Sequence, residues 1–138
     1  TPNGKAEVRK PGKDVTIVTY SIMVQKCEEA AMELEKEGIS VEVIDLLTLK
    51  PFDIQTVIDS VKKTHRCVVA HEAVVTGGLG AEIASQVQEK AFFYLDAPVL
   101  RVGAKNLPIA FSSVLEKFIA AGQDDIKKAV RSVLYREG

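Results

Sequence analysis

Two kinds of segment alternate along this chain. Four short segments are predicted strands, and the first of them is a β-branched run typical of a strand buried on both faces of a sheet. They cover residues 14–20, 39–46, 66–71 and 98–103. Between and after them, apolar residues recur every three or four positions, as in amphipathic helices. This order predicts an α/β fold in which helices cover both faces of a mostly parallel sheet.

Four helices are predicted by these apolar stripes and by residues that start or stop helices. The stripes cover residues 23–34, 54–61, 79–87 and 126–134. Gly38 is expected to end the first helix, and Pro51 and Asp53 to open the second. Gly77, or the residue before it, opens the third. Two aspartates place negative charge on the first turn of the last.

Composition sets the class of protein. A length of 138 residues fits one domain, and 46% hydrophobic with 27% charged residues is ordinary for a globular protein. Eighteen basic residues stand against 19 acidic ones without a basic block, so we expect no nucleic-acid partner. No apolar run approaches the ~20 residues that a membrane-spanning helix needs, so we expect no membrane either.

The start of the chain and its two cysteines indicate a longer parent protein and a reducing compartment. "TPNGKAEVRKPGKD" has no apolar core, so it is not a secretory signal, and it begins without methionine. We expect it to be part of a longer protein, cut at a linker. Cys27 and Cys67 each lie within an apolar pattern, which predicts reduced, buried side chains and a reducing compartment.

The sequence motifs of common α/β enzymes are absent. The first strand leads into "TYSIMVQ", which lacks the glycines of a dinucleotide-binding turn, so Asp45 is interpreted as a polar strand end rather than a ribose ligand. Neither a P-loop nor a G-x-S-x-G elbow is present. His65 and His71 do not have metal-ligand spacing with the cysteines. We therefore assign no catalytic, cofactor-binding or metal-binding residue.

The segment "HEAVVTGGLGAEIA" (71–84) has two interpretations. His71 and Glu72 end a predicted strand, and Gly77, Gly78 and Gly80 lie near the start of a helix. A histidine acid–base over a phosphate cradle is one interpretation, since helix N-termini bind anions. A strand-to-helix loop whose glycines allow close packing is the other. We favour the second, because this spacing is not that of a phosphate loop.

Two further polar residues raise the same question. Lys50 in "TLKPFD" could bind an anion, but a proline and an aspartate that open a helix explain this segment without a ligand. Asp96 in "YLDAPV" stands in a loop before a strand, where an acid is expected to be exposed and solvated.

Five motifs together resemble a known family. They occur in order across nearly the whole chain: "GKDVTIVTYSIMV", "VEVIDLLTLKPFD", "VVAHEAVVTGGLGAEIA", "YLDAPVLRVGAKNLPIAFSSVLE" and "DDIKKAVRSVL". They resemble the C-terminal domain of the β subunit of thiamine-diphosphate-dependent 2-oxoacid dehydrogenases, either pyruvate or branched-chain, within the transketolase C-terminal domain class. Each motif is unspecific alone, and their common order carries the resemblance.

The resemblance implies a specific fold. It is a three-layer α/β/α sandwich with a five-stranded, mostly parallel sheet whose first strand is antiparallel. "KAEVRK" (5–10) would be that strand. Residues 1–13 would then be a lead-in with a possible edge strand, and residues 14–138 the transketolase C-terminal-like domain.

The resemblance also implies a role within a larger enzyme. The parent enzyme would decarboxylate a 2-oxo acid on thiamine diphosphate and transfer the acyl group to lipoyl. The cofactor would be bound by other domains, so this chain alone is expected to be inactive. Its partners would be the α subunit, a second β subunit and the subunit-binding domain of the acyltransferase core. The location would be cytoplasmic, or the mitochondrial matrix in a eukaryote.

Roles for individual residues follow from the matched motifs. Asp96 matches the acid of the family's L-[DE]-A-P loop, which pairs with an arginine of the subunit-binding domain. Tyr135 would be an apolar anchor near the same docking surface. His71 and Glu72, together with the glycines that follow them, would be structural or interfacial.

The chain departs from the family pattern at three positions. Ser21 stands where many relatives have glycine, Leu47 where they have arginine, and Asn106 where aspartate is common. Any ion pair of that arginine should be absent here. Two alternatives stay open: the matching domain of a transketolase or deoxyxylulose-phosphate synthase, and a standalone regulatory or interaction domain that binds an anion at the glycines.

Overall fold

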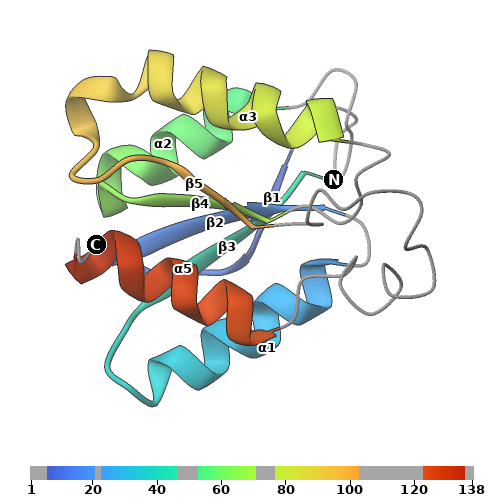
Figure 1. The fold of residues 1–138 in the computed structure, drawn as a ribbon, viewed down its shortest axis with the longest axis vertical. Helices are drawn as coiled ribbons and strands as arrows, with labels where there is room; N and C mark the ends of the chain where they lie inside the picture. Colours follow the sequence, from blue (N-terminus) through green and yellow to red (C-terminus); the bar gives the residue numbers. More distant parts are fainter. Residues whose placement is uncertain (1–5, 21–22, 47–52, 71–76, 103–122, 136–138) are drawn as a thin grey trace, which may run out of the picture.

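A five-stranded sheet forms the centre of the molecule (Figure 1). The structure, a computed structural model, describes residues 6–20, 23–46, 53–70, 77–102 and 123–135. The strands are β1 (Glu7–Lys10), β2 (Val15–Thr19), β3 (Val41–Asp45), β4 (Cys67–Ala70) and β5 (Leu100–Val102), in the spatial order β1-β3-β2-β4-β5. Strand β1 is antiparallel to β3, and the other pairs are parallel. The predicted antiparallel edge strand is confirmed, with the bounds Glu7–Lys10.

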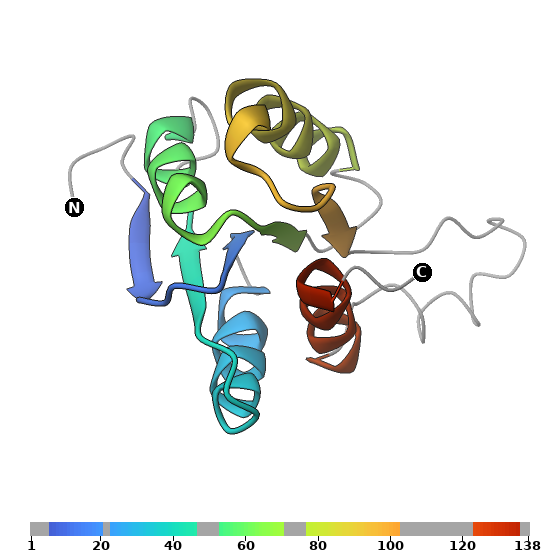
Figure 2. The ribbon, with the colours of Figure 1, turned by 90° about the vertical axis from the view of Figure 1, so that its left-hand side faces the viewer.

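Two helices cover each face of this sheet (Figure 2). Helices α1 (Met23–Glu35) and α5 (Gln123–Tyr135) lie on one face, and α2 (Ile54–Thr64) and α3 (Gly77–Lys90) on the other. Strand side chains alternate accordingly: Ile17 packs with α1 and α5, whereas Val18 packs with α2 and α3. The predicted three-layer α/β/α sandwich is confirmed.

Two helix ends are those that the sequence predicts, whereas Pro51 lies outside the described residues. After α1, Gly38 has φ +87°, and the N–H groups of Gly38 and Ile39 donate to the carbonyl oxygens of Glu35 and Leu34 at 3.0 and 3.1 Å. This is a Schellman ending, in which glycine adopts the left-handed conformation without a Cβ clash. Asp53 caps α2, because its carboxylate accepts from the N–H of Thr56 at 3.2 Å.

The segment between β1 and β2 is closely attached to β3. The N–H of Gly12 donates to Glu42 Oε1 at 3.0 Å, and the N–H of Lys13 donates to Ser40 Oγ at 3.1 Å. A Cβ on Gly12 would lie 2.3 Å from the carbonyl carbon of Val41, so only glycine allows this approach. The division into a lead-in over 1–13 and a domain over 14–138 stays a prediction.

Candidate functional site

One end of the sheet carries an exposed aromatic turn and the half-exposed Asp96. The parallel strands begin there, and we call it the amino edge (Figure 1). Helices α2 and α3 cross back over the sheet and end at this edge, where they lead into β4 and β5. Residues 91–99 and the turn after α2 therefore lie together at the amino edge.

An exposed aromatic turn follows α3 at the amino edge. The short 3₁₀ helix η2 (Phe92–Tyr94) has edge-to-face contact between Phe92 and Phe93, with ring centroids 5.4 Å apart. The residues on both sides of η2 point inward, since Ala91 is fully buried and Leu95 packs against the α2/α3 core. Phe93 is 94% exposed.

Asp96 follows this turn and is joined to the end of α2. Its N–H donates to the carbonyl oxygen of His65 at 2.8 Å, and its Oδ2 lies 3.7 Å from Arg66 Nη2. The Asp96 side chain is 53% exposed, as the sequence led us to expect. Because this ion pair is long, it leaves the carboxylate accessible to a further cation.

His65 connects the two segments that form this surface. It caps the C-terminus of α2 in the left-handed conformation, with φ 66°, and its N–H donates to the Val61 carbonyl oxygen at 2.7 Å. Its Nδ1 lies 2.7 Å from the carbonyl oxygen of Tyr94, so this nitrogen carries the proton in the bonded tautomer. The turn after α2 and the turn after α3 are therefore held in one fixed arrangement.

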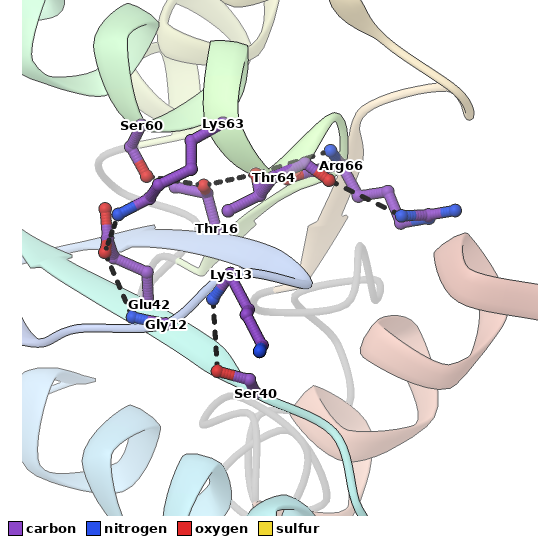
Figure 3. Close-up of polar contacts among 9 residues, drawn as sticks. All are labelled: Gly12, Lys13, Thr16, Ser40, Glu42, Ser60, Lys63, Thr64 and Arg66. Atoms are coloured by element: carbon purple, nitrogen blue, oxygen red, sulfur yellow. Dashed lines mark hydrogen bonds and ion pairs between the residues drawn. The ribbon is translucent and has the colours of Figure 1, made fainter.

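A buried chain of hydroxyl groups orients α2 beneath this surface (Figure 3). Thr16 Oγ1 lies 2.6 Å from Ser60 Oγ and 2.7 Å from Thr64 Oγ1. Thr64 Oγ1 in turn donates to the carbonyl oxygen of Arg66 at 3.0 Å. These bonds fix the rotation of α2 against β2, which places His65 and Arg66.

Glu42 extends this buried polar group toward β1. Lys63 Nζ donates to Glu42 Oε1 at 2.7 Å, beside the bond from Gly12 (Figure 3). Burial alone would raise the pKa of Glu42, but the hydrogen bonds from Lys63, Ser60 and Gly12 outweigh it and hold the pKa below 4.5. Glu42 is therefore a charged, structural carboxylate.

Asp45, three residues later on β3, has the opposite electrostatic behaviour. Burial raises its pKa above 3.8, and the Arg9 guanidinium, 3.8 Å away, only partly opposes this. Arg9 is shared with Glu28 of α1 and with Glu7. The interpretation of Asp45 as a polar strand end agrees with these contacts.

The glycines lie at the opposite, carboxyl edge of the sheet. Strand β4 ends at Ala70, and α3 begins at Gly77, so Gly77, Gly78 and Gly80 belong to the first turn of this helix. His71 and Glu72 lie outside the described residues, as do Lys50 and the three departures Ser21, Leu47 and Asn106. Their proposed roles stay predictions.

The remaining predicted residues are Tyr135 and the two cysteines. Tyr135 is the last residue of α5, which ends at the amino edge (Figure 1). Cys27 and Cys67 are free and buried, as predicted, and burial raises the pKa of each thiol to about 12. Thiols with such pKa values are not nucleophiles at neutral pH.

The described part of the chain contains neither a group of metal ligands nor a helix suited to a membrane. No three His, Cys, Asp or Glu side chains there are grouped so that they could hold a metal ion. None of the described helices is long and apolar enough to cross a membrane.

The Asp96 surface also includes four residues that the sequence did not predict there: His65, Arg66, Phe92 and Phe93. Two adjacent phenylalanines in a chain with only 6% aromatic residues were the available signal. Their exposure does not follow from periodicity, because the residues on both sides of η2 are apolar as well.

Curated relatives match almost the whole chain. The pyruvate dehydrogenase E1 component subunit beta of Rickettsia bellii is 48% identical over 97% of the chain, and that of Rhizobium meliloti is 43% identical over 98%. The mitochondrial protein of the same name from Dictyostelium discoideum is 44% identical over 98%. The chain spans only 41%, 29% and 38% of these relatives.

Solved structures and a family profile agree with this match. A structure described as a split gene transketolase, inactive beta4 tetramer, has a TM-score of 0.80 and 35% identity, covering 98% of this chain and 44% of that one. The profile of the family named "Transketolase, C-terminal domain" matches residues 4–126. This chain therefore belongs to the transketolase C-terminal domain family.

Proposed function

We propose that this chain is the assembly and docking domain of the β subunit of a 2-oxoacid dehydrogenase. The observation that carries the proposal is the match of relatives named pyruvate dehydrogenase β subunit over 97–98% of the chain. These names favour pyruvate over a branched-chain 2-oxo acid as the substrate. The parent enzyme decarboxylates this substrate on thiamine diphosphate and transfers the acyl group to lipoyl.

In this proposal the catalytic centre belongs to other parts of the enzyme. The relatives extend well beyond the region matched here, which leaves room for the domains that bind thiamine diphosphate. The chain alone is then inactive and assembles with the α subunit and a second β subunit. Its buried, unpaired cysteines suit the cytoplasm or the mitochondrial matrix.

Asp96 is the proposed docking residue for the subunit-binding domain of the acyltransferase core. Its carboxylate is half exposed, and the long contact with Arg66 leaves room for an arginine from a partner. Tyr135 would contribute an apolar contact at the same edge of the sheet. Such a charge pair acts mainly on the association rate and on the orientation of the partner.

A titration of the 138-residue chain with the subunit-binding domain from the same organism tests this role. Asp96→Asn should weaken binding about three- to tenfold at low salt, and this difference should shrink as salt is added. Glu33→Gln on α1 is the matched control, because it removes the same charge from the other side of the sheet. Equal binding by the two variants, or no binding by the wild type, would contradict the proposal.

The similarity to the split gene transketolase supports a second candidate, in which the parent protein transfers sugar-phosphate fragments. The full-length protein distinguishes the two: a transketolase would turn over sugar phosphates, and a 2-oxoacid dehydrogenase would consume pyruvate.

A further inference from the structure

The phenylalanines of η2 lie outside the core, since Phe92 is 57% and Phe93 94% exposed. Five large hydrophobic residues are exposed in the described part of the chain, and three of them are consecutive. These three are Phe92, Phe93 and Tyr94. Scattered exposed apolar residues are normal, but contiguous ones mark interaction surfaces.

These side chains are held outward by the backbone. The N–H of Ala91 donates to the Val87 carbonyl oxygen, and the N–H of Tyr94 donates to that of Ala91, both at 2.9 Å. The N–H of Leu95 then donates to the Phe92 carbonyl oxygen at 3.2 Å. Because Ala91 and Leu95 point inward, η2 cannot rotate its phenylalanines into the core without losing these contacts. A partner would therefore meet aromatic side chains that are already positioned, at a small ordering cost.

The charges around η2 restrict the kind of partner. Lys62 Nζ lies 5.3 Å from the centre of the Tyr94 ring, and Arg66 Nη2, in the turn after α2, lies 3.7 Å from Asp96 Oδ2. A uniformly basic partner face would be repelled by these two cations. A single cation directed at Asp96, beside an apolar side chain directed at Phe93, is the complementary arrangement.

We infer that Phe92 and Phe93 form the apolar half of the docking surface whose ionic half is Asp96. This inference rests on the proposed function and names the same occupant, the subunit-binding domain of the acyltransferase. That domain inserts an aliphatic side chain against the two phenylalanines while its arginine pairs with Asp96. Hydrogen bonds of His65 with Tyr94 and Asp96 keep the two halves at a constant separation.

Calorimetric titration of the 138-residue chain with the subunit-binding domain, at low and high salt, tests this surface. Phe93→Ser should weaken binding about tenfold or more at both salt concentrations, since an apolar contact is not screened. Met32→Ser is the matched control, because Met32 is 59% exposed on α1 across the sheet, and it should bind like the wild type. Thermal unfolding of both variants should be unchanged.

The outcomes separate the two proposals. If Phe93→Ser binds like Met32→Ser while Asp96→Asn is weaker, the apolar half is refuted and the proposed docking role stands. If the wild type does not bind, both proposals fail. A tenfold loss for Phe93→Ser that is independent of salt, beside a salt-dependent loss for Asp96→Asn, supports the two-part surface.

Discussion

The two faces of the sheet are stabilised in different ways. On the α1/α5 face, a cluster of apolar side chains fills the space between the sheet and the helices. On the α2/α3 face, an apolar cluster is joined by the buried hydroxyl groups of Thr16, Ser60 and Thr64 and by the Glu42–Lys63 pair. Apolar contacts are non-directional, whereas hydrogen bonds require one geometry. The α2/α3 face therefore fixes the orientation of α2 as well as stabilising the fold.

This difference is relevant to the proposed docking surface. Helix α2 ends at His65, whose backbone and ring hold Asp96 and Tyr94 in place. A helix that could slide or rotate would move all of these groups together. The hydroxyl chain opposes such movement on the face that leads to Asp96.

The largest expected effect on stability is on the α1/α5 face. Leu34 of α1 is fully buried, so Leu34→Ala should lower the free energy of unfolding by about 2–5 kcal/mol through lost burial and the cavity left behind. Urea unfolding measures the loss, and the exposed Met32→Ala on the same helix is the control, with a change within about 0.5 kcal/mol. A loss below about 1 kcal/mol for Leu34→Ala would show that this face repacks.

A smaller effect is expected from the hydroxyl chain. Thr16→Val keeps the shape of the side chain but leaves Ser60 and Thr64 without their shared partner, which should cost about 1–3 kcal/mol in urea unfolding. Adding Ser60→Ala and Thr64→Val to Thr16→Val should lower the stability further, because these changes also remove the bond from Ser60 to Glu42 and the bond from Thr64 to the Arg66 carbonyl oxygen. If the triple variant is as stable as the wild type, directional bonding is not what distinguishes this face.

The smallest effect is a difference in pH dependence between two carboxylates of β3. The pKa of Glu42, on the α2/α3 face, is lowered below 4.5 in the folded protein, so its stabilising contribution is present above pH 4.5 and is lost as the pH falls through the folded pKa. The pKa of Asp45 is raised above 3.8, so its contribution is present below pH 3.8 and is lost as the pH rises through the folded pKa.

Urea unfolding at about pH 7 and about pH 3 separates these two contributions. Glu42→Gln should reduce the loss of stability on acidification, whereas Asp45→Asn should increase it. The wild type provides the reference slope for both variants. Slopes that change in the same direction would mean that the two faces do not differ in their electrostatics.

Much of the fold could be predicted because its signals are local. Gly38 ends α1 since glycine alone adopts φ +87° without strain, and Asp53 caps α2 through a bond to a residue three positions away. The apolar runs predicted the four parallel strands to within about two residues at each end, a normal boundary error. The antiparallel edge strand came from the family resemblance, because "KAEVRK" alternates too weakly to indicate a strand.

Which distant residues meet depends on the folded chain. Gly12 contacts β3 thirty residues away, Thr16 bonds to α2, and His65 bonds to the turn that carries Asp96. Local pattern was enough for the four parallel strands, the four helices, their order and the exposed acid at position 96, since propensity and periodicity act within a few residues. Exposure of Phe93 and the pKa directions of Glu42 and Asp45 depend on neighbours that the folded chain brings together, so no local pattern could specify them.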